Sequence, residues 1–326
     1  MNSATQLKMM GSSPAFLSVL RASRLVAVTG ATVLIQGESG VGKELLAESI
    51  HEASRQADGP FVAVNCAALS ETLVESELFG HAKGAYTGAV AKRIGRIAAA
   101  HKGTLFLDEI GDMPLSIQAK MLRFLENGEC QPLGVEQPAR VEVRVVAATN
   151  RDLAALVAAG QFRQDLYHRL HVVPLLLPPL RERGQDVALL ANAFLASFAT
   201  RHGVALPAFS RSALELLRSH TWPGNVRELR NLCERLVIFQ AGQEISDTCI
   251  RGQLFPHAAC GTNKADFTPA LAPFSLPSDG LSLEWVERNL ILAALERTHG
   301  NRTHAAKLLD LSRDTLLYRM RKYALR

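Results

Sequence analysis

The sequence predicts an α/β domain built on a parallel sheet, followed by a helical segment and a small helical tail. Short, almost continuously apolar runs alternate with helical patterns over the first part of the chain, which is typical of strands covered on both faces. Apolar residues then recur at spacings of three or four from about Asp186 to Gln240. The strand candidates are Thr32–Gln36, Phe61–Val64, Thr104–Leu107 and Val143–Ala147.

A length of 326 residues allows more than one domain. Four prolines between residues 256 and 280, interspersed with Gly, Ser, Asn and Thr, mark a linker. Helical periodicity resumes after it. We therefore expect a short extension, an α/β part, a helical lid, a linker and a helical C-terminal domain, with the boundaries 1–10, 11–180, 181–255, 256–280 and 281–326.

The excess positive charge is confined to one end of the chain. The net charge is +5, from 36 basic and 31 acidic residues. His299–Arg326 holds seven of the basic and two of the acidic residues, so the preceding 298 residues, with 29 of each, are neutral. A basic tail on a neutral body indicates a nucleic-acid contact at the tail and a different task upstream.

Other classes of protein are disfavoured by the sequence. The apolar stretches are far shorter than the roughly 20 residues that span a bilayer, and residues 1–11 do not resemble a signal peptide. The five cysteines are scattered without a CxxC spacing, as expected for reduced thiols. We therefore expect a cytoplasmic protein without membrane insertion.

A phosphate-binding loop directly follows the first strand candidate and precedes an amphipathic helix. In this G-x-x-x-x-G-K pattern, glycines let backbone N–H groups turn toward phosphate oxygens and a lysine reaches the β- and γ-phosphates. The sequence therefore predicts a nucleoside triphosphate site. Its loop residues are Gly37, Glu38, Ser39, Gly40, Val41, Gly42, Lys43 and Glu44.

Glu44 stands where a Ser or Thr normally places a hydroxyl on Mg²⁺. The metal must then rely on phosphate oxygens, water and another carboxylate. The run Thr104–Leu107 ends in Asp108 and Glu109, the expected second half of such a site. We expect Asp108 to orient Mg²⁺ and its waters, and Glu109 to polarise the water that attacks the γ-phosphate.

With these motifs in place, the chain from about Gly11 to Arg326 resembles the bacterial enhancer-binding proteins, the AAA+ ATPases that activate sigma-54 RNA polymerase. The segment Glu75–His81 runs into a hexapeptide that resembles the family's surface loop, which engages sigma-54 when ATP is bound. The family usually has Phe in place of Tyr86, and Glu44 is ordinary in it. The residues of the loop are Gly84, Ala85, Tyr86, Thr87, Gly88 and Ala89.

The resemblance also implies roles for five further residues. Asn65 is similar to the residue that holds the catalytic glutamate in an inactive pose. Asn150, after a strand candidate, resembles sensor I near the γ-phosphate. Arg163 and Arg169 are similar to the arginine fingers that reach a neighbouring subunit's nucleotide, and Arg227 resembles sensor II on the lid. Arginines supplied in trans make hydrolysis depend on assembly.

The basic tail resembles the family's helix-turn-helix, with Asp310 where the turn usually has Gly. We expect Ser312 to cap the second helix, which would enter the major groove of enhancer DNA. The residues expected to contact DNA are Thr303, Ser312, Arg313, Thr315, Tyr318, Arg319, Arg321 and Lys322. The small core between the two helices is expected to contain Ala305, Leu308, Leu316 and Leu317.

The helix before the helix-turn-helix, Ser282–Thr298, is expected to dimerise through one apolar face. That face would carry Leu283, Val286, Leu290 and Ala294.

The resemblance implies a ring-forming ATPase, with ATP and Mg²⁺ as cofactors, that binds enhancer DNA and remodels sigma-54 RNA polymerase holoenzyme. Only about ten residues precede Gly11, a layout shared with the phage-shock activator and some virulence activators. We therefore expect control to come from a separate regulatory protein acting in trans, from the expression level or from another subunit. Whether the resting state is a dimer or a hexamer stays open. Two alternatives are a DNA-binding regulator that uses ATP without sigma-54, and a chaperone-like ATPase with a DNA tether.

Overall fold

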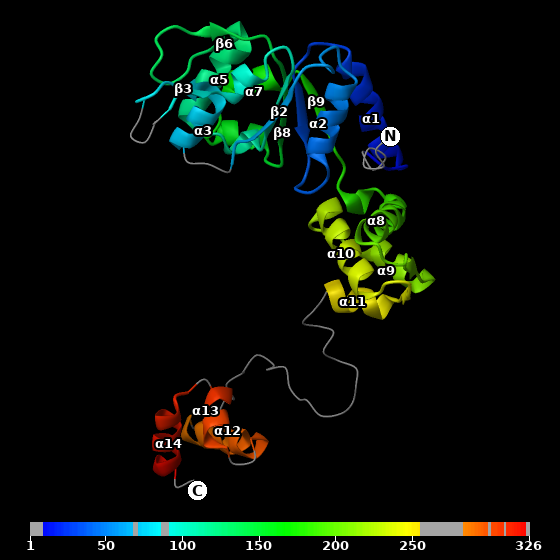
Figure 1. Cartoon of the computed structure of the whole chain (residues 1–326), viewed down its shortest axis with the longest axis vertical. Coiled ribbons are helices and arrows are strands. Elements are labelled where there is room, and N and C mark those ends of the chain that lie inside the picture. Colours follow the sequence, from blue (N-terminus) through cyan, green and yellow to red (C-terminus); the bar gives the residue numbers. More distant parts are fainter. Residues whose placement is uncertain are drawn as a thin grey trace. The chain divides into compact units, whose positions relative to one another are not determined.

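The computed structural model describes residues 9–67, 71–85, 91–254, 283–298, 301–309 and 311–323. The chain divides into two compact units, Met1–Gly261 and Thr262–Arg326, and Figure 1 shows the elements of each. None of the helices in the described ranges is long and apolar enough to cross a membrane.

The first unit is built on a five-stranded sheet in which every pairing is parallel, with the strand order β2-β5-β8-β1-β9. The four predicted strands are confirmed. A fifth was not predicted, because its alternating exposure and its proline are those of an edge strand. The strands are β1 (Val33–Gln36), β2 (Phe61–Asn65), β5 (Thr104–Asp108), β8 (Arg144–Thr149) and β9 (Val173–Leu176).

Helices cover both faces of this sheet, as its apolar strands require. Val33, Ile35 and Phe106 pack with α1 and α2 on one face, whereas Leu34 and Leu105 face the opposite core with α3, α5, α6 and α7 (Figure 1). The helices are α1 (Pro14–Ala27), α2 (Lys43–Glu52), α3 (Glu71–Phe79), α4 (Arg96–Ala99), α5 (Leu115–Asn127), α6 (Leu153–Ala158) and α7 (Gln164–Leu170).

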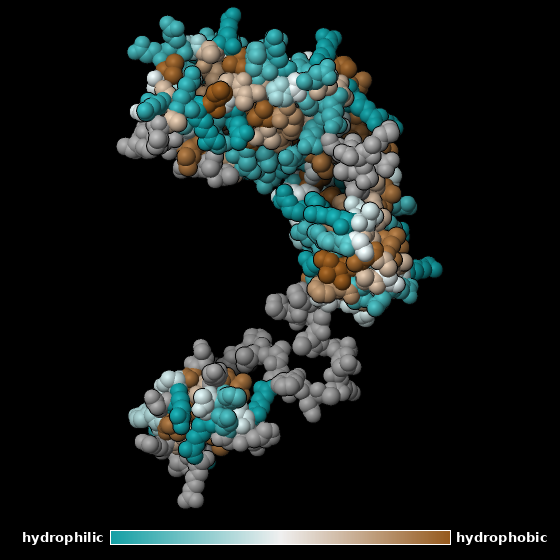
Figure 2. Space-filling view, in the orientation of Figure 1, coloured by the Kyte–Doolittle hydropathy of each residue, from teal (hydrophilic) through white to brown (hydrophobic). Residues whose placement is uncertain are grey.

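Short elements extend the α/β body away from the main sheet. Between β2 and β8 in the chain lie two antiparallel strand pairs and one 3₁₀ turn. They are β3 (Gly80–His81) with β4 (Arg93–Ile94), β6 (Glu129–Cys130) with β7 (Ala139–Arg140), and η2 (Ile110–Asp112). Hydrophobic and hydrophilic residues are interspersed over the face of this body that Figure 2 presents.

The lid that follows β9 is a helical layer with its own core around the fully buried Trp222. The predicted helical spacing is confirmed, because Val187, Leu190 and Phe198 are buried in that core and Phe194 packs against it. The lid contains η3 (Leu180–Glu182), α8 (Asp186–His202), β10 (Ala208–Phe209), α9 (Arg211–Ser219), α10 (Asn225–Phe239), β11 (Glu244–Ile245) and α11 (Asp247–Leu254).

The second unit contains α12 (Leu283–Arg297), α13 (Arg302–Leu308) and α14 (Arg313–Lys322). The Ser312 hydroxyl accepts a hydrogen bond from the Thr315 N–H at 3.1 Å, which confirms the predicted cap of the second helix. The buried residues of the core are Ile291, Ala294, Ala305, Ala306, Leu316 and Met320.

Two expectations about this unit are wrong. Leu308, the last residue of α13, is 57% exposed, so it does not belong to the core. Leu290 and Ala294 do not share one exposed apolar face, because Leu290 is 54% exposed while Ala294 is buried in the core with residues of α13 and α14; the dimer itself stays a prediction. Residues 310 and 282 lie outside the described ranges.

The described cysteines, Cys66, Cys130, Cys233 and Cys249, are free thiols, as expected, and Cys260 lies outside the described residues. Burial raises the pKa of Cys66 and Cys233 to about 12, so both are protonated and unreactive at neutral pH.

A buried ion pair ties the N-terminal segment to the start of the lid. Asp186 is fully buried and accepts hydrogen bonds from the Ser12 N–H at 2.6 Å and the Ser13 N–H at 3.1 Å. Its other oxygen accepts from Arg183 Nε at 3.1 Å, and that guanidinium lies 3.8 Å from the centre of the Phe16 ring. The segment before α1 is therefore held by the lid.

We predict that Asp186→Asn lowers the free energy of unfolding by about 3–5 kcal/mol, because the Arg183 charge is left buried without a carboxylate. Urea unfolding at neutral pH measures this loss. Asp247→Asn, which removes an exposed i,i+4 pair with Arg251, is the control and should cost less than about 1 kcal/mol. Equal losses in the two variants would contradict the account.

The same pair predicts a pH dependence. Burial acts to raise the pKa of Asp186, but the hydrogen bonds from Ser12 and Arg183 outweigh it, and the pKa is lowered. The contribution of Asp186 is thus complete above the unfolded-state pKa of about 3.9 and is lost as the pH falls through the lower, folded-state value.

Candidate functional site

The P-loop turns between β1 and α2 at the carboxyl edge of the sheet. Gly40 and Gly42 have φ angles of 79° and 105°, which residues with a Cβ rarely adopt. A Cβ on Gly42 would meet nothing within 4 Å, and Gly42, the N-cap of α2, has no side chain that could accept from the first N–H groups of the helix. Open space beside the glycine at a helix start is where the unpaired N–H groups of a first helical turn can bind a phosphate.

Lys43 lies under this loop and connects it to the acidic pair. Its side chain is only 7% exposed, and its ammonium donates to the Gly37 carbonyl at 3.0 Å and to Glu109 Oε1 at 3.2 Å. The other carboxylate oxygen of Glu109 accepts from the Asn150 backbone N–H at 3.0 Å. Residues from the ends of β1, β5 and β8 thus meet, as the parallel sheet requires.

Glu109 is held in a strained backbone conformation. Its φ is 51°, in the left-handed region, and it begins the 3₁₀ turn η2 directly after β5. Strain of this kind at a non-glycine residue is typical of functional sites, where the surrounding structure maintains it. The carboxylate is thereby turned back toward Lys43.

Asp108 ends β5 beside Glu109, and its environment suits a cation. Burial and the neighbouring negative charge of Glu109 raise the pKa of Asp108, and Lys43 offsets part of that effect. The described ranges contain no group of three or more His, Cys, Asp or Glu that could hold a metal. A single carboxylate next to a phosphate site fits Mg²⁺, which is usually bound through one or two carboxylates, water and substrate phosphates.

The expected contact of Asn65 with the catalytic glutamate is not present in this arrangement. Asn65 ends β2, in register with Asp108, and its side-chain oxygen accepts from the Ala67 N–H at 2.9 Å. Within the described residues, the Glu109 carboxylate is bound by Lys43 and by the Asn150 N–H. Asn65 therefore lies beside Asp108, the residue before Glu109, on the neighbouring strand. Its side chain, however, hydrogen-bonds within the turn that follows β2.

The lid reaches the P-loop through Arg227, whose guanidinium donates to the Ser39 hydroxyl at 3.2 Å and whose N–H donates to the Gly40 carbonyl at 3.3 Å. Sequence reasoning singled out Arg227 but missed Arg181 and Asn225, which bind Glu38. No local pattern could reveal the Arg181–Glu38 pair, because 143 positions separate the two residues.

Arg163 and Arg169 lie at the two ends of α7. Arg163 makes two hydrogen bonds to Asp165, at 2.7 and 3.1 Å, and an open hollow of about 490 Å³ adjoins it, lined also by Gln164 and His168. Arg169 donates to the Leu125 carbonyl at 2.9 Å. In the described part of the chain, neither guanidinium forms a hydrogen bond or an ion pair with the P-loop, Asp108 or Glu109.

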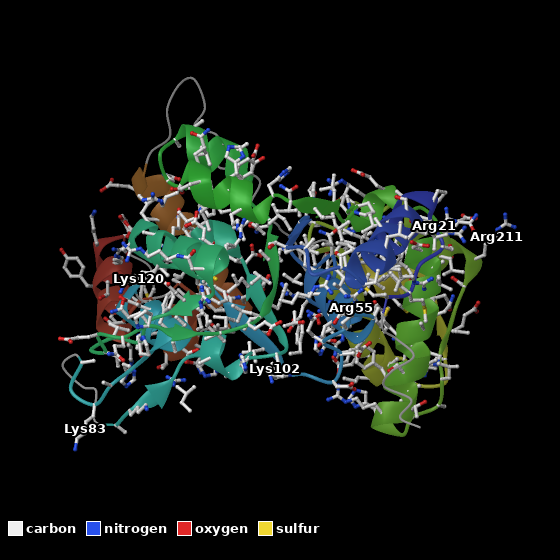
Figure 3. All side chains as sticks on the ribbon, turned by 90° about the horizontal axis from the view of Figure 1, so that it is seen from above. Arg21, Arg55, Lys83, Lys102, Lys120 and Arg211 are labelled. Carbon is white, nitrogen blue, oxygen red and sulfur yellow. The ribbon has the colours of Figure 1, made fainter. Side chains whose placement is uncertain are left out.

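The predicted surface loop starts from the β3–β4 pair. Gly84 and Ala85 are described, whereas Tyr86, Thr87, Gly88 and Ala89 lie outside the described residues. Lys83, just before the loop, points away from the body in Figure 3. Gly80, at the base, has a φ of 83° and its Cβ would lie 2.6 Å from the Arg93 carbonyl, so only glycine allows this pairing.

A second loop, missed in the sequence, supports the base of the first. It joins β6 and β7, and its Leu133 N–H donates to the Gly80 carbonyl at 3.0 Å while its carbonyl accepts from the Ala82 N–H at 2.9 Å. Gly134 in this loop lies close to Ala85. Strands of two residues give too little periodicity to be found from sequence.

The residues expected to bind DNA fall into two groups. Thr303, Ser312, Arg313 and Tyr318 are exposed, and Thr315 is half-buried beside Ser312. Arg319 forms an ion pair with Glu287, and Lys322 lies 3.2 Å from Glu284, so both basic groups are held by α12. Arg321 is within α14, and its side chain is not described.

Three family signatures match successive parts of the chain. The Sigma-54 interaction domain matches residues 9–176, the AAA+ ATPase lid domain residues 181–266, and the Bacterial regulatory protein, Fis family, residues 282–323. The chain belongs to the sigma-54-dependent transcriptional activators. The resemblance seen in the sequence and the predicted fold class, a AAA+ ATPase with a helical lid and a C-terminal helix-turn-helix, are confirmed.

Relatives of this sigma-54-dependent activator share most of its length. The transcriptional regulatory protein ZraR of Salmonella typhimurium is 47% identical over 319 residues, covering 98% of this chain and 69% of ZraR. The regulatory protein AtoC of Escherichia coli is 44% identical over 313 residues, covering 96% and 67%. NtrX from Brucella abortus, solved in complex with ADP, is 31% identical with a TM-score of 0.72, covering 99% and 71%.

We predict that Glu109→Gln lowers the rate of ATP hydrolysis by at least about 100-fold, because the amide cannot polarise the attacking water. The variant should still bind ATP. Phosphate release and titration with a fluorescent ATP analogue measure the two properties. Glu215→Gln, on the exposed side of α9, is the matched control. Undiminished hydrolysis by Glu109→Gln would exclude Glu109 as the base.

Proposed function

We propose that this activator assembles into a hexameric ring, binds enhancer DNA in the bacterial cytoplasm, and uses ATP hydrolysis to convert sigma-54 RNA polymerase holoenzyme into the open complex. The observation that carries the proposal is the junction of Lys43 with Glu109 at 3.2 Å beneath an open P-loop. The part of the chain that matches the Sigma-54 interaction domain, residues 9–176, also contains the loop predicted to contact sigma-54.

In the proposed reaction, N–H groups of residues 38–43 and the Lys43 ammonium bind the phosphates of ATP. Asp108 would hold Mg²⁺, which would supply charge neutralisation at the phosphates when bound. Lys43 leaves Glu109 for the phosphates, and the freed carboxylate orients the attacking water. Asn150 and Arg227 extend toward the same space from β8 and from the lid.

The proposal assigns Arg163 and Arg169 to the nucleotide of a neighbouring subunit. Support comes from their exposure at the two ends of α7 and from their making no hydrogen bond to their own P-loop in the described residues. A guanidinium delivered in trans stabilises the charge that develops on the transferred phosphoryl group. Hydrolysis would then require assembly.

Sigma-54 would bind the loop Gly84–Ala89, with Tyr86 and Thr87 at its centre. The sequence places Tyr86 among small residues, Gly84, Ala85 and Gly88, which offer little local cover to an aromatic side chain, and this favours a protein contact. The C-terminal unit would place α14 in the major groove of enhancer DNA, with Arg313 and Tyr318 exposed for contact.

We predict that Thr87→Ala weakens the complex with sigma-54 by at least about tenfold, because a central contact of a small interface is removed. Co-precipitation with sigma-54 in the presence of an ATP transition-state mimic measures the complex. Thr200→Ala, on α8 of the lid, is the control. A regulator that works without sigma-54 would give no nucleotide-dependent complex even with the unmodified protein.

We predict that Arg313→Ala lowers affinity for the enhancer and reduces the salt dependence of binding by about one charge, because one phosphate contact is lost. Fluorescence anisotropy at several salt concentrations measures both. Arg288→Ala, exposed on α12, is the control. An equal effect of the two variants would place the DNA contact elsewhere in the unit.

A further inference from the structure

The carboxylate of Glu38 is directed toward the lid, although Glu38 is part of the P-loop. Arg181, in the 3₁₀ turn that begins the lid, donates from both terminal nitrogens to Glu38, at 2.6 and 2.9 Å. This bidentate geometry fixes direction as well as distance. The first turn of the lid is thereby bound to the second residue of the phosphate-binding loop.

Asn225 completes the connection from within the protein. It is fully buried, and its side-chain N–H groups donate to Glu38 Oε2 at 3.0 Å and to the Ser39 carbonyl at 3.1 Å. Its side-chain oxygen accepts from the Leu180 N–H at 2.8 Å. One amide thus joins the P-loop, η3 and α10, and an aspartate or leucine of similar size could not make both sets of bonds.

Backbone geometry at Asn225 supports a role beyond packing. Its φ is 50°, in the left-handed region that asparagine tolerates better than most residues. The preceding Gly224 lies against Gly40, where an added Cβ would come within 2.4 Å of the Gly224 carbonyl. The lid and the P-loop are therefore in backbone contact at this point, with no side chain between them.

The ion pair itself contributes little to stability. Arg181 and Glu38 are 43% and 42% exposed, and pairs so exposed have small effects on folding. The hydrogen bonds from Arg181, with those from Asn225, lower the pKa of Glu38 to about 2, so the pair stays charged at every working pH. The Arg181–Glu38 pair is permanently charged and well aligned but adds little to the free energy of folding. It therefore affects the position of the lid on the P-loop more than the stability of the protein.

We propose that Glu38, Arg181 and Asn225 form a latch that sets the orientation of the lid on the P-loop, so that Arg181 is a positioning residue for ATP binding. The inference rests on the nucleotide site proposed above. Through the latch and Arg227, the lid contacts three successive P-loop residues, Glu38, Ser39 and Gly40. Lid orientation and phosphate affinity are then linked in both directions.

The test compares Arg181→Gln with Arg211→Gln in the full chain. Arg211 projects from the lid, away from the α/β body, and is 94% exposed (Figure 3). Arg181→Gln should raise the KM for ATP about tenfold and leave kcat within about twofold, because the latch acts on ground-state binding. Arg181→Lys, which keeps the positive charge but cannot make the two parallel hydrogen bonds of the guanidinium, should recover only part of the affinity for ATP.

The double variant Glu38→Gln/Arg181→Gln separates a latch from two unrelated effects. Its KM should not exceed that of the worse single variant, because the two residues act through one contact. Thermal unfolding within a few degrees of the unmodified protein shows that the variants fold. A KM of Arg181→Gln equal to that of Arg211→Gln, or additive effects of the two substitutions, would overturn the latch.

The unmodified protein and Lys43→Ala distinguish this failure from failure of the nucleotide site. If the unmodified chain hydrolyses ATP, Lys43→Ala does not bind it, and Arg181→Gln behaves normally, only the latch is excluded. If the unmodified chain neither binds nor hydrolyses ATP, the proposed function fails and the latch fails with it.

Discussion

The contact between Lys43 and Glu109 is the interaction on which the rest of the nucleotide site depends. A buried ammonium at the base of the P-loop needs acceptors, and it finds them in the Gly37 carbonyl and the Glu109 carboxylate. The same contact keeps the glutamate next to the place where phosphates would bind. In the proposed function, phosphate groups would compete for Lys43, so occupancy of the loop would control the carboxylate.

Parallel pairing makes this contact possible. The ends of β1, β5 and β8 lie at one edge of the sheet, so a lysine after the first strand meets an acid after the third and an N–H after the fourth. The lid covers the same edge through its contacts with Glu38, Ser39 and Gly40. A second, buried connection through Arg183 and Asp186 holds the lid to the segment before α1.

The sequence predicted the features that depend on local pattern. The apolar strands, the P-loop, the Asp108–Glu109 pair and the Ser312 cap each occupy a few consecutive residues, and the structure has each in place. The edge strand β9 and the β6–β7 pair were not predicted, because these strands are short and partly exposed. The contacts of Arg181 and Asn225 with the P-loop were not predicted, because their partners are distant in the chain.

Long-range pairing also explains the errors in the C-terminal unit. Helical spacing indicates which residues share a face, but it cannot show which face a neighbouring helix covers, and Leu308 and Leu290 lie on uncovered faces. All basic side chains of α14 were expected to contact DNA, and that expectation stays a prediction, but Lys322 and Arg319 also form ion pairs with Glu284 and Glu287 of α12. A count of charges does not reveal such internal pairs.

The zero net charge of the first 298 residues does not mean that charged groups are unimportant there, because opposite charges are paired in the site, as at Lys43 and Glu109.

Transcription from a supercoiled template with purified components tests most directly the central claim that hydrolysis at this site drives sigma-54 polymerase. The account predicts transcripts with sigma-54 holoenzyme and ATP, and none with a non-hydrolysable ATP analogue. Equal transcription with the analogue, or with a holoenzyme that carries a different sigma factor, would contradict it.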